Sequence, residues 1–295
     1  MRGVIEAFVQ SLAAAGAAQQ RNVSLNTVMA YRSDLEQFCD FLERRGQHTW
    51  SVSPLEVIEY KRDLEVRYAK ATTRARKLAA VKAFYRYLVR TDQVASDPAR
   101  HLDVPVPIKH APETLSREQL SLLVSSARAT DGAPPLEEAK SLRDYAMLSL
   151  LSSTGLLASE LVALDLASRA DAGALDLGAP SRQRTVTLDE ATGAALDAYL
   201  AAGRPLLARG RSAEPALFVN HRGRRLTRQG FWLIVKQCAK RAGVDGISPR
   251  LLRHSCAAHK LTDGVQLKDV QELLGHAHAS TTQAYVRARP VEVAP

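Results

Sequence analysis

Residues 143–155 read RDYAMLSLLSSTG, and the helix that this stretch predicts is apolar on nearly all of its sides. Such a helix is stable only where neighbouring elements cover every face, so we expect it at the centre of a domain. The pattern around it is mainly helical. Helices are predicted at 116–127 (SREQLSLLVSSA), 227–242, about 249–262 and 267–274.

A short β region interrupts these helices. ALDL (174–177) and RTVTL (184–188) predict two strands on either side of a Gly-Ala-Pro-Ser turn, and ALFVN (216–220) is a candidate third strand. Near the end of the chain, Ser280-Thr-Thr-Gln283 has the spacing of a capping box. It predicts a helix that begins at Ser280 and carries Tyr285 in its second turn. The expected fold class is therefore mainly α with a small β-sheet (α+β).

The first hundred residues predict a separate helical domain. Apolar residues recur every three or four positions across 28–46 and again across 72–90, and a further helix starts at Pro54. VPVPIKHAP (104–112) cannot continue a helix and favours an extended chain. We therefore expect an N-terminal helical domain at 1–103, a linker at 104–113 and a mixed domain at 114–295.

Composition narrows the class of protein. The chain has 295 residues, of which 46% are hydrophobic and 24% charged, as in an ordinary globular protein. No apolar run reaches the roughly 18 residues that a membrane span needs, so no membrane partner is expected. Three widely spaced cysteines indicate reduced thiols and predict a cytoplasmic protein.

The net charge of +9 is concentrated in two tracts, one in each predicted domain. Seven cations and no acid lie in the first tract: Lys70, Arg74, Arg76, Lys77, Lys82, Arg86 and Arg90. Nine cations against Asp245 lie in the second: Arg222, Arg224, Arg225, Arg228, Lys236, Lys240, Arg241, Arg250 and Arg253. Solvated helix faces usually mix charges of both signs, whereas unmixed cations favour a polyanion such as DNA or RNA.

Several strings, in order along nearly the whole chain, resemble the tyrosine recombinases, the family of phage integrases and Xer-type enzymes. They are TVMAYRSDLEQFCDFL (27–42), TTRARKLAAVKAFYRYL (72–88), RDYAMLSLLSSTGLLASEL (143–161), LFVNHRGRRLTRQGFW (217–232), LLRHSCAAH (251–259) and VQELLGHAHASTTQAY (270–285).

The resemblance implies a C-shaped clamp on double-stranded DNA, and an enzyme that works as a tetramer on paired sites, in some cases with a second recombinase. In such enzymes a tyrosine attacks a phosphodiester, forms a 3′-phosphotyrosine and releases a 5′-hydroxyl, with no metal or other cofactor. The implied DNA contacts in this chain are Arg32, Arg74, Arg76, Lys77, Arg182, Arg222, Arg224, Arg225 and Arg228. Most of them are expected to contact phosphate.

The resemblance places the nucleophile at Tyr285, the histidine of the LLGH string at His276 and the second catalytic arginine at Arg253. At three other family positions the chain departs. Leu157 stands where the family has its first arginine, Ala179 at the hairpin lysine and Arg250 at the first histidine.

These departures predict weak catalysis. Removing one preorganised hydrogen-bond donor to a transition-state oxyanion costs roughly 10²–10³ in rate. We expect a DNA-binding recombinase that cleaves poorly on its own, and the alternative is an inactive accessory or regulatory relative. Arg182 or Arg184 of the hairpin is a candidate to replace the lost charge, and Glu160 either orients a cation or caps a helix. No zinc site is expected, since His254, His259, His276 and His278 have no Cys or carboxylate at ligand spacing.

Overall fold

The computed structural model describes residues 1–18, 25–105, 111–130, 132–170, 173–178, 184–211 and 213–290. The chain divides into two compact units, residues 1–109 (unit 1) and residues 110–295 (unit 2). No helix in the described ranges combines the length and the apolar character that crossing a membrane requires.

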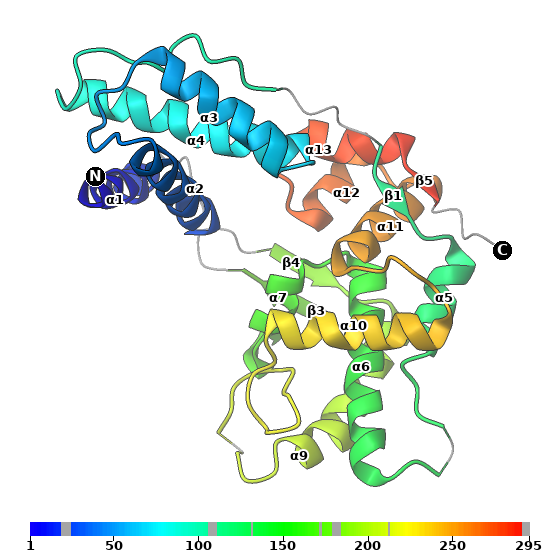
Figure 1. Ribbon diagram of the computed structural model, residues 1–295. Coiled ribbons are helices and arrows are strands. Elements are labelled where there is room, and N and C mark those ends of the chain that lie inside the picture. The colour runs from blue at the N-terminus through cyan, green and yellow to red at the C-terminus, as the bar shows by residue number, and fades with distance from the viewer. Residues whose placement is uncertain are drawn as a thin grey trace. The chain divides into compact units, whose positions relative to one another are not determined.

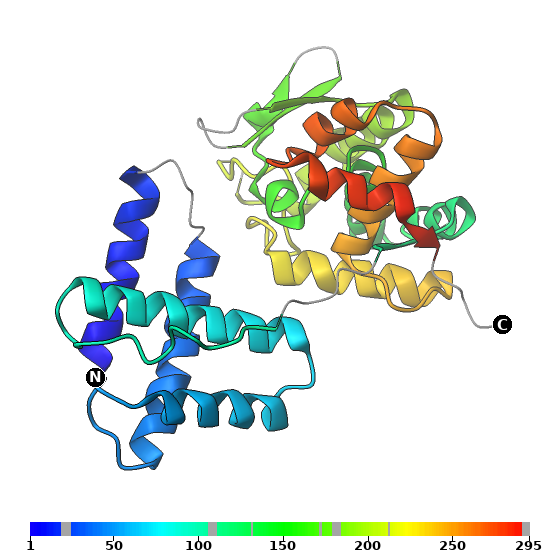
Figure 2. The ribbon, with the colours of Figure 1, turned by 90° about the horizontal axis from the view of Figure 1, so that it is seen from above.

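Unit 1 consists of the helices α1 (Arg2–Ala18), α2 (Leu25–Arg44), α3 (Pro54–Arg67) and α4 (Ala71–Arg90). Helix α1 packs beside α2, and α3 packs beside α4 (Figure 2). The start of α3 is fixed by a capping box, in which Ser53 Oγ accepts from Leu55 N and Glu56 Oε2 accepts from Ser53 N at 2.9 Å. The aromatic rings of Phe8, Phe38 and Phe84 are buried in the core of this unit.

Unit 2 is built around α6 (Pro135–Thr154), the helix predicted to be central (Figure 1). Ala146, Met147 and Leu150 on this helix are fully buried. The elements α5 (Arg117–Ser125), α8 (Glu190–Ala198) and α11 (Pro249–Thr262) contact it on different sides. The other helices of the unit are α7 (Ala158–Ala163), α9 (Arg204–Leu207), α10 (Arg228–Ala242), α12 (Leu267–Leu274) and α13 (Ala279–Gln283).

A three-stranded antiparallel sheet carries the predicted hairpin. Its order is β2 (Arg169–Ala170), β3 (Ala174–Leu177) and β4 (Arg184–Thr187). The prediction of a strand at 216–220 is wrong. This segment makes isolated bridges to Asp165 and Arg225 instead, because its backbone groups bond to two different loops. A second, parallel pair joins β1 (Glu113–Thr114) to β5 (Arg289–Pro290).

The last helix begins one residue earlier than predicted. His278 precedes α13 without a side-chain cap, so the predicted capping box at Ser280 is wrong. The Thr282 side chain is buried and bonds to His276. Tyr285 follows in a short 3₁₀ helix, η4 (Ala284–Arg287), which continues directly from α13.

Helix α6 ends at Gly155, which has the left-handed conformation with φ of 65°. A Cβ atom at this position would lie 2.6 Å from Leu274 Cδ2 and 3.3 Å from Cys256 Sγ. Gly155 therefore lets the end of α6 approach α11 and α12 closely. Gly243 ends α10 with almost the same backbone angles, but nothing lies within 4 Å of its ideal Cβ position.

These two glycines form a matched pair for a stability test. We expect Gly243→Ala to cost about 1–2 kcal/mol, the penalty of the left-handed conformation. Gly155→Ala carries the same penalty and about 1–3 kcal/mol more, because the added methyl group clashes with Leu274. Differential scanning calorimetry of the full chain measures both losses. Equal losses for the two variants would mean that Leu274 moves aside freely and that Gly155 has no packing role.

Candidate active site

A cleft of about 900 Å³ lies in unit 2, between the N-terminal ends of α7 and α11, strand β4 and the turn from α12 to α13. All four predicted catalytic residues line this cleft, and so does Leu157, so that two of the three departing positions, Leu157 and Arg250, are in it. The lining includes Tyr285, Arg253, His276, Arg250, Leu157, Glu160, Arg184 and His254. The structure therefore brings residues that lie far apart in the chain to one place.

Tyr285 lies against the wall of the cleft and is 7% exposed. Its ring stacks on His276, with the centroids 6.0 Å apart and an interplanar angle of 15°, and meets the edge of His254 at 5.3 Å. Burial raises the pKa of the phenol, while the positive charges of Arg253 and Arg250 act in the opposite direction. The phenol is therefore protonated at neutral pH.

Arg253 is held by two main-chain carbonyl groups. Its Nη1 donates to Gly155 O at 2.8 Å and its Nη2 donates to Leu274 O at 2.7 Å. Glu160 Oε2 lies 4.0 Å from Nη1. Burial lowers the pKa of this guanidinium and Glu160 opposes that shift, but an arginine keeps its proton in proteins. Arg253 is thus a fixed positive charge beside Tyr285.

His276 follows the end of α12, and its Nδ1 lies 2.9 Å from Thr282 Oγ1. Burial, together with the charges of Arg253 and Arg184 and with His254, lowers the pKa of the imidazole to about 4. The ring is therefore neutral at pH 7 and has one N–H to donate. Sequence reasoning missed Thr282, because no pattern links a buried hydroxyl to a histidine six residues earlier.

Arg250 lies in the first turn of α11 and is exposed. Its Nε donates to His254 Nε2 over 3.4 Å, one helical turn further along. Burial lowers the pKa of His254, and Arg250 and Arg253 add to the shift. Arg250 therefore presents a cation to the cleft at the position where the sequence comparison expected a histidine.

Leu157 precedes α7 at the rim of the cleft and is 45% exposed, with a side chain that has no hydrogen-bond donor. Its backbone N–H donates to Glu160 Oε2 at 2.8 Å. Glu160 also accepts two hydrogen bonds from Arg184, at 2.6 and 2.9 Å. Glu160 thus caps α7 and orients a cation, the two roles left open by the sequence. Ala179 and Arg182 lie outside the described residues.

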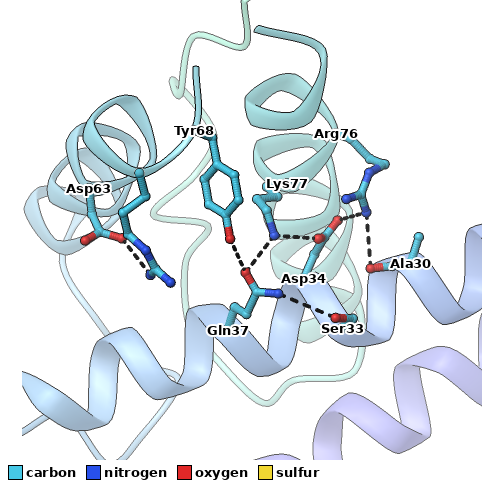
Figure 3. A network of polar contacts seen from close by, with 9 residues as sticks. Ala30, Ser33, Asp34, Gln37, Asp63, Tyr68, Arg76 and Lys77 are labelled. Carbon is cyan, nitrogen blue, oxygen red and sulfur yellow. Dashed lines mark hydrogen bonds and ion pairs between the residues drawn. The ribbon is translucent and has the colours of Figure 1, made fainter. Parts of the chain in front are cut away.

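The residues of unit 1 that are predicted to contact DNA differ in how exposed their side chains are. Lys77 is 2% exposed and donates to Asp34 Oδ1 at 2.9 Å and to Gln37 Oε1 at 2.7 Å (Figure 3). This interior position argues against a contact between Lys77 and DNA. Arg76 pairs with the same Asp34 but is exposed. Arg74 donates to the carbonyl groups of Tyr68 and Ala69. Arg32 pairs with Glu6 at the surface.

In unit 2 the predicted contacts also fall into two groups. Arg222, Arg224 and Arg228 are exposed, and Arg228 lines the cleft. Arg225 is partly buried, where it donates to Val162 O and Leu164 O and pairs with Asp165. The fold uses Arg225 to join two loops, whereas the other three side chains extend from the loop and the first turn of α10.

No metal centre stands out in the part of the chain that the structure describes. No group of three or more His, Cys, Asp or Glu side chains there is arranged to hold an ion. Two of the four histidines considered from the sequence, His254 and His276, lie beside Tyr285, while His259 bonds to Leu115 O. The three cysteines are buried and none forms a disulfide.

Comparisons with known proteins cover both units. Residues 113–292 match the Phage integrase family, and residues 5–92 match its N-terminal SAM-like domain. The chain is 39% identical to tyrosine recombinase XerC of Roseiflexus sp. (strain RS-1), over 100% of this chain and 94% of the relative. It is 36% identical to tyrosine recombinase XerD of Corynebacterium glutamicum, over 91% and 89% of the two chains.

Solved structures agree on the fold. The XerH site-specific recombinase bound to its difH substrate superimposes with a TM-score of 0.70 at 19% identity, over 90% of this chain and 78% of that one. A lambda integrase dimer bound to a core site gives a TM-score of 0.70 at 14% identity, over 100% and 99%. Together with the cleft around Tyr285, these matches mean that the chain belongs to the phage integrase family of tyrosine recombinases, as a relative of the Xer type.

Proposed function

We propose that this protein is a site-specific recombinase that binds double-stranded DNA and cleaves one strand through Tyr285. The observation that carries the proposal is the position of Tyr285 in one cleft with Arg253, Arg250 and His276. A phosphodiester is the substrate that suits this set of groups, because it offers an electrophile to the phenol and negative oxygens to the cations.

In the proposed step, the phenolic oxygen of Tyr285 forms a bond to phosphorus and the bond from phosphorus to the 5′-oxygen breaks. The phenol gives up one proton, and the 5′-hydroxyl that leaves takes up one. The product is a 3′-phosphotyrosine, and attack by another 5′-hydroxyl reverses the step. Bond energy is kept in the phosphotyrosine, so strand rejoining needs no nucleotide cofactor.

The electrostatics of the cleft support this step. Four guanidinium groups, those of Arg184, Arg228, Arg250 and Arg253, line it together with the carboxylate of Glu160. Because His276 is neutral at pH 7, it lines the cleft without adding charge. The surplus of positive charge suits a phosphorane, which carries more negative charge than the diester from which it forms.

We also propose that cleavage is slow when the chain acts on its own. Leu157 offers no donor to a phosphate oxygen, and guanidinium groups such as that of Arg250 hold their protons too tightly to act as general acids. Loss of one oxyanion donor costs roughly 10²–10³ in rate, and several losses do not add simply. A DNA-binding relative without cleavage is the second candidate, favoured by the apolar side chain at Leu157.

The partners belong to the same proposal. Relatives in the crystal structures named above are bound to DNA, which supports duplex DNA as the substrate here. We propose that residues 1–103 and 114–295 each bind the duplex, and that four protomers assemble on paired sites in the cytoplasm. A second recombinase that completes the tetramer would supply groups that this chain lacks.

Trapping of a covalent intermediate tests the proposed cleavage. Duplexes enriched by the protein from a random-sequence pool are nicked at successive positions across the site, so that a short strand diffuses away after cleavage and prevents rejoining. We expect an SDS-resistant protein–DNA adduct that forms slowly and requires Tyr285, since the phenol is the nucleophile. The Tyr285→Phe variant, which differs by one oxygen atom, should bind the same duplexes and give no adduct.

A second variant separates the two candidate functions. Leu157→Arg/Ala179→Lys/Arg250→His restores the residues that the family resemblance implies, and we expect it to raise the rate of adduct formation by at least 10²-fold, about the loss expected for one donor. An adduct from the restored variant alone would identify the natural chain as a DNA-binding relative. An adduct that persists in Tyr285→Phe would place the nucleophile elsewhere.

The exposed arginines of unit 2 predict a localised phosphate contact. Each phosphate that a cation neutralises contributes about 0.9 to the slope of log affinity against log salt concentration. We expect Arg222→Ala/Arg224→Ala to reduce that slope by about 1–2, measured by fluorescence anisotropy with an enriched duplex. Arg117→Ala/Arg128→Ala removes two exposed arginines of the same unit from a different region and should leave the slope unchanged. Equal reductions in both variants would contradict a localised contact.

His276 generates a prediction about pH. Its pKa is about 4 in the folded chain and about 6.5 in the unfolded chain. Below pH 6.5 the unfolded state binds a proton that the folded imidazole does not, so this stability contribution is complete above pH 6.5 and is lost as the pH falls towards 4. Histidine Cε1–Hε1 signals in NMR spectra, assigned with a His276→Gln variant, should show a midpoint near 4. A midpoint near 6.5 would contradict the lowering of the pKa by burial and the neighbouring arginines.

A further inference from the structure

We infer that Arg184 binds a non-bridging oxygen of the scissile phosphate and supplies the positive charge that Leu157 cannot. The inference rests on the proposed cleavage by Tyr285. It assigns a substrate contact to a hairpin residue whose side chain lies in the same cleft as Leu157, Arg253 and Tyr285.

The first argument is position. Glu160 Oε2 accepts a hydrogen bond from Leu157 N at 2.8 Å and another from Arg184 Nη2 at 2.9 Å. A single oxygen atom therefore links the guanidinium group to the backbone of residue 157. Arg184 places its charge beside the position where the family resemblance implies an arginine, although it reaches that place from β4 rather than from the start of α7.

The second argument is the number of donors. Arg184 uses Nε to bond Leu273 O at 3.0 Å, and one N–H each of Nη1 and Nη2 to bond Glu160. A guanidinium group has five N–H groups, so these bonds leave two for a ligand among the residues that the structure describes. The side chain is 18% exposed, and the cleft gives a ligand access to it.

The third argument is preorganisation. A carboxylate and a carbonyl group fix the guanidinium from two sides, and Gly275 closes over it, since a Cβ there would lie 3.0 Å from Nη1. A donor that is already in place needs no reorganisation when charge develops on the phosphate. The charge of Arg184 also acts on His276, which stacks on Tyr285, because it is among the causes that lower the pKa of His276.

The competing explanation is that the Arg184–Glu160 ion pair only supports the fold. DNA with an uncharged group at the scissile position distinguishes this explanation from a contact with phosphate. A methylphosphonate at the scissile position replaces one charged oxygen by a methyl group, so cleavage no longer needs a second cation to neutralise the phosphate. The test variant is Arg184→Gln/Glu160→Gln, which removes both charges, leaves no unpaired buried carboxylate and retains amide hydrogen bonding. The matched control is Arg117→Gln/Asp263→Gln, which removes an exposed ion pair of the same unit.

The full-length variants are incubated with nicked duplexes of an enriched sequence, with phosphate or methylphosphonate at the scissile position. We expect the test variant to form the Tyr285 adduct at least about 10²-fold more slowly on phosphate DNA, the loss typical of one oxyanion donor. On methylphosphonate DNA the loss should be much smaller. Adding Leu157→Arg to the test variant should restore cleavage of phosphate DNA, and the control variant should behave as the natural chain does.

Three outcomes would overturn the inference. Equal slowing on the two substrates would show that the pair only supports the fold, and no slowing would show that Arg184 makes no contact. A natural chain that cleaves methylphosphonate DNA but not phosphate DNA would show that Arg184 does not replace the missing charge, while Tyr285 remains the nucleophile. No adduct on either substrate, even with Leu157→Arg, would refute the proposed cleavage itself.

Discussion

The buried guanidinium of Arg253 joins the ends of two helices. Its two hydrogen bonds go to the carbonyl groups of Gly155, which ends α6, and of Leu274, the last residue of α12. Helix C-termini present unsatisfied carbonyl groups and a partial negative charge, so they stabilise a buried cation without neutralising it fully. Displacing either helix would remove one of these two bonds from a buried charged group, which is destabilising.

The arrangement of the cleft follows from this constraint. Once α12 is held by Arg253, the turn after Leu274 fixes His276. The contact of His276 with Thr282 then fixes the end of α13, from which η4 continues. Tyr285 then packs with Ala257, Val270 and Leu274 in a small apolar cluster. Tyr285 is therefore positioned by helix ends and apolar packing, rather than by a bond to its hydroxyl group alone.

Periodicity and short motifs predicted the structural features that depend on residues close together in the sequence. Eight helices (α2 to α6 and α10 to α12) and the hairpin belong to this class, whereas the grouping of Tyr285 with His276 was expected from the family resemblance. The features that could not be predicted depend on contacts with residues that are distant in the sequence. Lys77 was counted as a surface cation because its acid, Asp34, lies 43 residues away on another helix. The strand expected at 216–220 was lost because its backbone bonds to two loops, which apolar composition cannot reveal.

The pairing of Glu160 explains how the chain tolerates leucine at position 157. A partly buried carboxylate without a counter-ion would be costly, and if an arginine at residue 157 were its only partner, leucine there would leave the charge unpaired. Here Arg184 forms a two-bond contact with Glu160, and Leu157 N–H adds a third. Leucine at 157 therefore leaves no unpaired carboxylate in the fold. Under the proposed function, the missing donor at 157 affects catalysis without a matching loss of stability, because the hairpin carries the structural part of the interaction.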